Sequence, residues 1–417
     1  MSGLRGDKQM KKLFLVVLIV LCCFSSLFAE EVKTPAIDPT GSAMYGALLK
    51  PYNPTSPRRL AMGNAGLAAV NGSDSLFYNP AGLADRKVVV QLPSVAFTLY
   101  HPYGMIQNGV IDDIKNMQAG DEDAKTDLAL HLKKALGNNY TKIADVDASV
   151  GFSAGGFGLA VNVKDTVHSY RVSSSDGGVF DSLNASIALG YGQRISIASN
   201  LSIDLGAAVR FNYLAYSGPV SLTEVLDKME NPEELLNQTP IMAGYSIPVD
   251  IGVGLNLPLN FKLAVVARNI NGKMHMNSYE NYEDALQNPL GASAKSESFT
   301  FDTDFSLDAG FAWSLKNSFF SPTIAVDVVD TIGIFKNKNG FEMRDLMSHL
   351  SAGAEVRVLY VLDVRGGFNQ GYWTLGAGLD LWAIKMDVAY FWQELGKTAG
   401  ANPVDGLTVK FNIGWDR

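Results

Sequence analysis

The chain has 417 residues, a formal net charge of −8 and only two cysteines, and 47% of its residues are hydrophobic. An acidic chain without a basic run is poorly suited to bind nucleic acid or an anionic lipid surface. Its length allows two ordinary soluble domains or one large β structure.

The first thirty residues predict export. Met10-Lys11-Lys12 precede an apolar run, Leu13–Ala29, which ends in a small residue before Glu30. This order is typical of a secretory signal peptide, so we expect residues 1–29 to be removed. A membrane-anchoring helix is the alternative, but the run is barely long enough and is diluted by Ser25-Ser26. Cleavage leaves 388 residues with 30 basic and 41 acidic side chains, a net charge of −11, and removes both cysteines.

From residue 87 onward, apolar and polar residues alternate in short segments. Between Leu201 and Tyr213, for example, most odd-numbered residues are apolar and the even-numbered ones are mostly polar or small. Such alternation predicts β-strands with one apolar and one wet face. We predict fourteen of them: 87–99, 143–154, 157–170, 179–192, 200–216, 244–257, 260–273, 297–315, 321–331, 348–358, 361–369, 372–382, 383–393 and 405–416.

A soluble β-sandwich would show the same alternation, but two details favour a membrane barrel. Apolar faces carry aromatic residues at the strand ends, such as Tyr390 and Trp392, as in the interfacial girdles of membrane barrels. Polar faces carry mid-strand charges, such as Asp204 and Arg210, which would cost roughly 2–4 kcal/mol each if they faced lipid. We therefore expect an all-β fold, in which residues 87–417 form a 14-stranded antiparallel transmembrane β-barrel. Its even strand number places both ends on the periplasmic side.

The connections alternate between short and long, which assigns short turns to the periplasm and long loops to the outside. The short ones include Gly155-Gly156, 257–260, 317–320 and the bend near Tyr360; the long ones are 100–142, 217–243, 274–296, 332–347 and 394–404. Helical spacing of Leu128, Leu132 and Leu136 predicts a helix in the first long loop.

The long loop 217–243 is predicted to hold a second helix. Ser221 and Glu224 form a capping-box pattern at its start. An apolar stripe follows on one face, formed by Leu222, Val225, Leu226 and Met229. The stripe either packs on the barrel rim or captures ligand in an exposed groove.

Nothing in the sequence argues for an enzyme. Gly151 to Gly155 match the G-x-S-x-G nucleophile pattern, but a second alternating strand follows where that motif needs a helix. The five histidines are scattered, without the spacing of a metal site. We expect no catalytic residues, no metal and no cofactor.

One turn motif, "GSDSLFYNPAGLA" from Gly72 to Ala84, stands immediately before the first strand. Pro80 fixes its own φ and biases Asn79 toward an extended conformation, while Gly82 adopts angles that other residues cannot. This pattern predicts a sharp chain reversal. It is either a plug inside the barrel lumen or a surface turn that leads into the first strand.

The longer segment "RRLAMGNAGLAAVNGSDSLFYNPAGLA", Arg58 to Ala84, resembles the N-terminal segment of the outer-membrane long-chain fatty acid transporter family (FadL-like). The resemblance implies that residues 30–86 form a plug, or hatch, inside a fourteen-stranded barrel. The implied hatch and gating residues are Phe77, Tyr78, Asn79, Pro80, Ala81 and Gly82.

The same resemblance implies passive uptake of long-chain fatty acids or other hydrophobic compounds across the outer membrane of a Gram-negative-type (diderm) bacterium. Ligand would land on the third and fourth outer loops, here 217–243 and 274–296, enter an apolar pocket and leave sideways through the wall. The expected partners are the hydrophobic ligand, outer-membrane lipid and the barrel assembly machinery, with no nucleic acid. Related barrels proposed to export or shuttle proteins share the segment, so a protein secretion or partner-binding component is the alternative, and a soluble periplasmic β protein is the third possibility.

Overall fold

The computed structural model describes residues 45–416, except for 120, 122, 171–177, 228–238, 292–296, 316, 318, 335–342 and 397–398. The predicted signal peptide, residues 1–29, and the first part of the expected hatch, residues 30–44, lie outside the described residues. Met229 of the predicted stripe does so as well.

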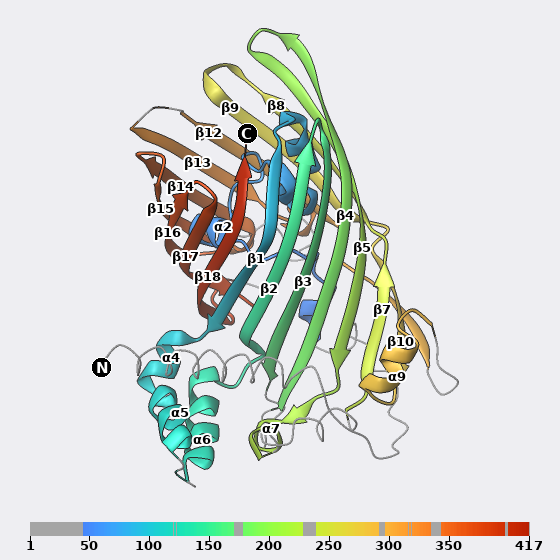
Figure 1. Cartoon of the computed structure of the whole chain (residues 1–417), viewed down its shortest axis with the longest axis vertical. Coiled ribbons are helices and arrows are strands. Elements are labelled where there is room, and N and C mark those ends of the chain that lie inside the picture. The colour runs from blue at the N-terminus through green and yellow to red at the C-terminus, as the bar shows by residue number, and fades with distance from the viewer. Residues whose placement is uncertain are drawn as a thin grey trace.

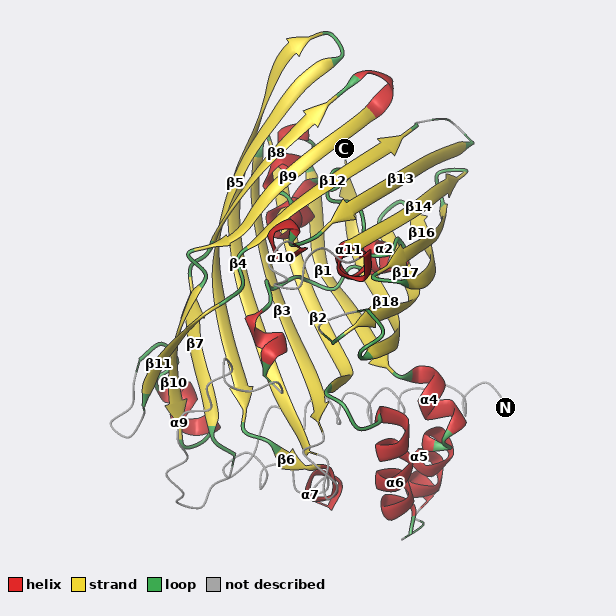
Figure 2. Ribbon diagram, turned by 180° about the vertical axis from the view of Figure 1, so that it is seen from behind, coloured by secondary structure: helices red, strands yellow, loops and turns green. Residues whose placement is uncertain are grey.

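The strands form one closed antiparallel ring (Figures 1 and 2). Closure is complete because β1 pairs with β2 on one side and with the last strand, β18, on the other. The strands are β1 (Val89–Tyr100), β2 (Thr141–Ala154), β3 (Phe157–Tyr170), β4 (Gly178–Ala198), β5 (Leu201–Ser217), β6 (Val220–Ser221), β7 (Ile241–Ser246), β8 (Val249–Asn256), β9 (Phe261–Ile270), β10 (Lys273–Tyr279), β11 (Ser298–Asp302), β12 (Ser306–Ser314), β13 (Phe320–Val328), β14 (Leu350–Val358), β15 (Leu362–Asn369), β16 (Tyr372–Leu381), β17 (Ile384–Glu394) and β18 (Pro403–Asp416).

Eighteen strand segments make fourteen barrel strands. The pairs β7/β8, β9/β10 and β11/β12 are each one barrel strand with a short interruption, and β6 is a two-residue addition beside β4. The predicted fourteen-stranded antiparallel barrel is therefore confirmed. The prediction of a loop over 274–296 is wrong at its start, because Met274 and Met276 continue the strand and bury their side chains.

The two faces of the wall differ as the alternation predicts. On β5, Val209 points outward and is 41% exposed, whereas the adjacent Ala208 and Arg210 face the lumen and are buried. Exposed Val, Leu, Ile and Phe side chains continue this outer face around the barrel, and the buried charged residues of the strands line the inside. Among the described residues, no helix combines the length and apolar character needed to cross a membrane.

Helices gather at the end of the barrel that carries the long connections (Figure 1). The loop after β1 forms three of them and the loop after β5 forms a fourth, which confirms both predicted helical loops. The elements there are α4 (Pro102–Gln107), α5 (Val110–Ala119), α6 (Ala124–Leu136), α7 (Leu222–Asp227) and α9 (Tyr282–Gln287). Two further helices, α10 (Thr331–Ile334) and α11 (Met343–His349), lie in the connection between β13 and β14 (Figure 2). The capping box also forms, since the Ser221 hydroxyl accepts the Glu224 N–H at 3.1 Å.

Three neighbouring barrel strands are interrupted one beside another. The interruptions fall at residues 247–248, 271–272 and 303–305, between β7 and β8, β9 and β10, and β11 and β12. Because these strands are adjacent in the ring, the gaps form one line across the wall. We call this line the wall break.

Candidate functional site

Residues 45–86, which we call the lumenal segment, lie inside the barrel (Figure 2). Its turns contact strands all around the ring: α2 touches β15 to β18, the turn at Gly72–Asp74 touches β1 to β3, and the turn at Pro80–Asp85 touches β4, β5 and β8. The elements are η3 (Gly46–Leu49), α2 (Pro57–Ala61), η4 (Gly72–Asp74), α3 (Ser75–Tyr78) and η5 (Pro80–Asp85). The chain therefore crosses the lumen from wall to wall.

The Asn-Pro-Ala turn is buried in the lumen and is not a surface turn. The Asn79 side chain caps η5: its Oδ1 accepts the Ala81 N–H at 3.0 Å, and its Nδ2 donates to the Leu67 carbonyl at 3.0 Å. Pro80 occupies the first position of that turn, where its missing N–H is not needed. A Cβ at Gly82 would collide with Ser75 and with the Val70 carbonyl, so only glycine fits this reversal.

Phe77 and Tyr78 fill space around this turn. The Phe77 ring stands edge-on to Tyr52, with 6.5 Å between centroids. The Tyr78 hydroxyl donates to the Pro54 carbonyl at 2.6 Å, and the Arg59 guanidinium lies 4.3 Å above its ring. Burial raises the pKa of Tyr78, so the phenol stays neutral and keeps this hydrogen bond.

Glycines of the wall receive the lumenal segment. At Gly252 an added Cβ would overlap Asn79, and at Gly206 it would overlap Pro80. The same holds around the ring, where a Cβ would press on the lumenal segment at Gly151, Gly158, Gly190, Gly192, Gly310, Gly353, Gly367 and Gly376. The wall is thus shaped for this segment, and the sequence alone could not have shown which strand glycines contact it.

Charged lumen residues hold the backbone of the segment. Asp327 of β13 accepts the N–H groups of Gly66 and Leu67 at 2.8 and 2.9 Å. Asp147 of β2 accepts the Thr55 N–H at 2.7 Å. Beside Asn79 the structure leaves a gap of about 20 Å³ between the segment and the wall. A gap measured in this way needs roughly 10–15 Å³ to hold a water, so there is room for about one water molecule here.

A cluster of packed apolar side chains, which we call the chamber, lies in the lumen on the side of the long loops. Strands β4, β5, β7, β10 and β11 supply most of its lining, and the N-terminal side chains Tyr45 and Leu48 fill it. The Tyr45 ring packs 4.7 Å from Phe180 and 5.2 Å from Tyr216, and its hydroxyl lies 3.3 Å from the Ser217 carbonyl. The buried members are Tyr45, Leu48, Phe180, Leu214, Tyr216, Met242, Met274, Met276 and Phe301.

The resemblance implied an apolar pocket, but the sequence analysis did not place its residues, although a signal for them exists. On β5 the lumen-facing residues are polar or small from Ser202 to Asn212, and then change to Leu214 and Tyr216. A strand that becomes apolar on both faces near its outer end indicates a dry compartment inside the barrel.

Polar groups and the lumenal segment close the wall break. The Asn269 side chain donates to Thr303 Oγ1 at 3.1 Å and to the Asp304 carbonyl at 3.2 Å, which bridges two interrupted strands. The Asp304 N–H donates to the Leu49 carbonyl of the lumenal segment at 2.7 Å. Arg268 donates to Asn53 Oδ1 at 2.6 Å. Leu49 and Asn53, which follow Tyr45 and Leu48 in the chain, are therefore attached to the wall break.

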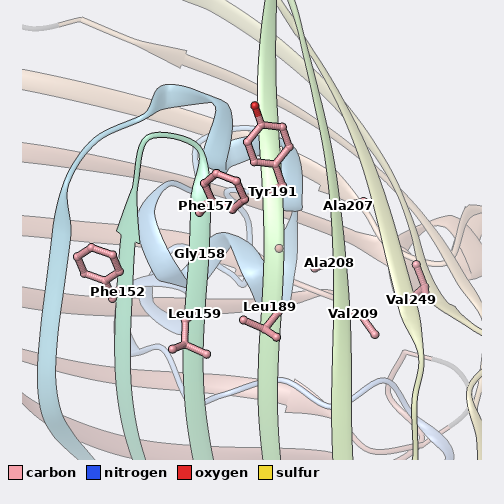
Figure 3. Close-up of a pocket in the computed structure, with 11 residues that line it drawn as sticks. Phe152, Phe157, Gly158, Leu159, Leu189, Tyr191, Ala207, Ala208, Val209 and Val249 are labelled. Atoms are coloured by element: carbon pink, nitrogen blue, oxygen red, sulfur yellow. The ribbon is translucent and has the colours of Figure 1, made fainter.

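A groove of about 490 Å³ lies on the outer face of the barrel, across β2 to β5 and β8 (Figure 3). The lumenal segment runs behind these strands in the same view. Phe157 and Tyr191 pack at one end with 4.6 Å between centroids, and Val249, the first residue after the wall break in its strand, borders the groove. The lining is Phe152, Phe157, Gly158, Leu159, Leu189, Gly190, Tyr191, Ala207, Ala208, Val209 and Val249.

The predicted stripe of α7 is packed against other helices. Leu222, Val225 and Leu226 are buried in a cluster with residues of α4 and α6, including Met105 and Leu128. Met229 lies outside the described residues. In this structure the three side chains do not form an open groove.

No protein-family model matches the sequence, and no curated protein matches it. Solved structures do resemble it. The toluene transporter TodX of Pseudomonas putida is 10% identical, with 88% of this chain and 99% of that one covered and a TM-score of 0.42. The toluene transporter TbuX of Ralstonia pickettii is 12% identical, with 88% and 98% covered and a TM-score of 0.41. A Pseudomonas aeruginosa FadL homologue is 13% identical, with 87% of this chain and 98% of that one covered and a TM-score of 0.41.

Proposed function

We propose that this protein is an outer-membrane channel for the passive uptake of hydrophobic small molecules. The apolar chamber inside the lumen carries the proposal. All nine of its described buried members are uncharged, and two of them, Tyr45 and Leu48, come from the chain's own N-terminal segment. A site that is filled by a detachable apolar side chain is suited to a ligand of the same character.

The path of the ligand follows from what adjoins the chamber. A ligand that displaces Tyr45 and Leu48 acts directly on Leu49, whose carbonyl is bound to Asp304 at the wall break. Loss of that hydrogen bond loosens the wall break. Val249, the first residue after the break in its strand, borders the groove on the outer face of the barrel. We propose that ligand passes from the chamber through the break into the groove and then into the membrane.

The lumenal segment acts as the hatch in this proposal. Residues 45–86 obstruct the straight route to the periplasm, with Phe77, Tyr78, Asn79, Pro80, Ala81 and Gly82 as the turn seated on the wall glycines. A hydrophobic ligand gains nothing from an aqueous exit, and a closed hatch keeps ions out while the ligand leaves sideways. Transport of this kind needs no catalytic residue and no cofactor.

Long-chain fatty acids are the proposed ligand class, with aromatic hydrocarbons as the competing one. The names of TodX and TbuX assign toluene to those two proteins. In this chain, methionines 242, 274 and 276 give part of the chamber a flexible lining that adapts to a bent acyl chain.

A matched pair of variants tests the chamber. Met276→Glu places a charge inside it, whereas Asn277→Glu places the same charge on the opposite face of β10. Binding of a dansyl-labelled fatty acid should weaken at least tenfold in the first variant and stay within twofold in the second. Heat-modifiable migration on gels checks that both barrels fold, and competition by toluene separates the two ligand classes. No binding by the folded wild-type protein would instead favour the secretion or partner-binding alternative.

The role of the Tyr45 side chain, which fills part of the chamber, is tested by Tyr45→Ala. Removing the ring empties part of the chamber, so the dansyl-labelled fatty acid should bind several-fold more tightly. Weaker binding in this variant would show that the Tyr45 ring contacts the bound ligand and does not merely occupy the ligand's place.

A further inference from the structure

Several turns at the end of the barrel that holds the short connections carry large apolar residues at their tips. Tyr360 is 61% exposed in the turn between β14 and β15, and Trp382 is 87% exposed in the turn between β16 and β17. Leu359, in the same turn as Tyr360, is also well exposed, and so is Phe319 in the turn between β12 and β13. Periplasmic turns in water would favour polar residues and glycine.

Turn geometry does not account for these residues. Leu359 and Tyr360 both have positive φ, 51° and 62°, in the three-residue connection 359–361, and positive φ usually selects glycine or asparagine. At the other end of β15, Gln370 and Gly371 form a two-residue turn with φ values of 51° and 100°, and there glycine is used. The side chains of Leu359 and Tyr360 are therefore kept in spite of the backbone conformation.

Strand length places these turns at the edge of the membrane. β14 has nine residues and β15 has eight. Nine residues span about 30 Å along a strand, and a tilt of about 40° reduces this to about 23 Å of height. The apolar band of such a barrel is about 25 Å tall. The turn between these strands consequently lies at the inner boundary of the band and not beyond it.

The hairpin of β4 and β5 provides the contrast. β4 has 21 residues, which corresponds to roughly 55 Å of height at the same tilt, so its tip extends well past the apolar band. That tip is polar, with Ser199 and Asn200 exposed. The apolar tips at Tyr360 and Trp382 belong to short strands and the polar tip to the longest one, and Leu259, 79% exposed between β8 and β9, is a further apolar tip.

The apolar tips are also continuous with the lipid-facing wall. Phe320, Leu362, Leu381 and Ile384 are the strand residues next to these turns, and all four are exposed on the outer face. Tyrosine and tryptophan are the residues that membrane proteins place at the level of the lipid headgroups.

We propose that the turns at Phe319, Leu359-Tyr360 and Trp382 insert into the headgroup and acyl boundary of the inner leaflet. They form a lipid anchor beneath β13 to β17. The partner is the bilayer itself, because the surface is continuous with the wall that already faces lipid. The anchor fixes the depth of the short-strand side of the barrel while the long β4–β5 hairpin extends into the periplasm.

Single cysteines test this directly, because the mature chain contains none once residues 1–29 are removed. Tyr360→Cys, Trp382→Cys and the control Asn200→Cys are labelled with the fluorophore NBD and reconstituted into phosphatidylcholine vesicles. NBD at 360 and 382 should be quenched by nitroxide on the lipid acyl chain and shielded from iodide, and NBD at 200 should behave in the opposite way. Equal iodide quenching at all three positions would overturn the anchor and leave the tips available to a soluble partner.

A second variant separates lipid contact from turn formation. The double change Leu359→Asn with Tyr360→Gly supplies the preferred turn residues and removes the apolar tips. Folding in detergent should be unchanged or faster, whereas folding into vesicles should slow several-fold. Unchanged folding in both media would show that the tips do not act on lipid.

Discussion

The Arg58 guanidinium of α2 holds the Glu355 carboxylate of β14 through two hydrogen bonds of 2.8 and 2.7 Å. Arg365 of β15 donates to the same carboxylate at 2.6 Å. Glu355 is therefore shared between the lumenal segment and the wall. The proximity of Glu355 also raises the pKa of Arg58, so the pair stays charged at any physiological pH.

Arg58→Ala should loosen the lumenal segment without unfolding the barrel. Glu355 keeps Arg365, so the change removes two charge-assisted hydrogen bonds, worth about 1–3 kcal/mol, without leaving an unpaired charge. Ion conductance in planar bilayers should rise. Arg357→Ala is the control, because Arg357 pairs with Asp363 of the neighbouring wall strand, at 2.7 and 2.9 Å. Equal conductance in the two variants would remove any specific role for Arg58.

Gly252→Ala should unseat the Asn79 turn. The new methyl would overlap the Asn79 carboxamide, which caps η5, so the turn must move or lose its cap. Gly254→Ala, two residues along the same strand, meets Asp204 and Ala81 only at ordinary contact distance. We expect higher conductance and altered uptake of a fluorescent fatty acid for the first variant only. If both variants conducted like the wild type, the turn would not be the seal.

Strand periodicity predicted the barrel well because one buried and one lipid-facing side impose a strict period of two. The strand 157–170 was predicted to the residue, since Gly155-Gly156 mark its hairpin. The residues of the chamber were not predicted because the strand patterns were interpreted as having one wet face throughout, while Leu214, Met276 and Phe301 make part of the lumen apolar. The wall break depends on which strands adjoin one another, and that long-range pairing has no local signature in the sequence.

The register of the wall is tested by a pair on β13. Ile324→Arg puts a charge on the lipid face, which should cost roughly 2–4 kcal/mol near the middle of the membrane. Thr323→Arg puts the same charge in the lumen, opposite Glu355 in the strand register. Yields of heat-modifiable barrel in vesicles should fall for the first variant and stay near wild type for the second. Similar losses for both would contradict the assigned faces.

His101 makes the outer helices sensitive to acid. Its ring lies 2.6 Å from the Thr141 hydroxyl, directly before α4, and burial lowers its pKa below the usual 6.5, with partial opposition from Asp405. The unfolded loop therefore binds the proton more readily, and stability that is present above pH 6.5 is lost as the pH falls below it. Amide exchange in α4 to α6 should accelerate between pH 7 and pH 5. Glutamine does not titrate, so His101→Gln should abolish the pH dependence of this exchange. An unchanged pH profile in the variant would show that another group causes the dependence.

Leu226→Ser tests whether the α7 stripe contributes to ligand capture. Leu226 is buried against the other outer helices, and replacing a buried leucine by a small residue costs about 2–5 kcal/mol. We expect α7 to detach, with faster proteolysis of the loop, and the dansyl-labelled fatty acid to bind more weakly, because the loop no longer presents an ordered apolar surface. Thr223→Ser changes an exposed position of the same helix and should alter neither measurement. Faster proteolysis with unchanged ligand binding would assign Leu222, Val225 and Leu226 to structural packing alone.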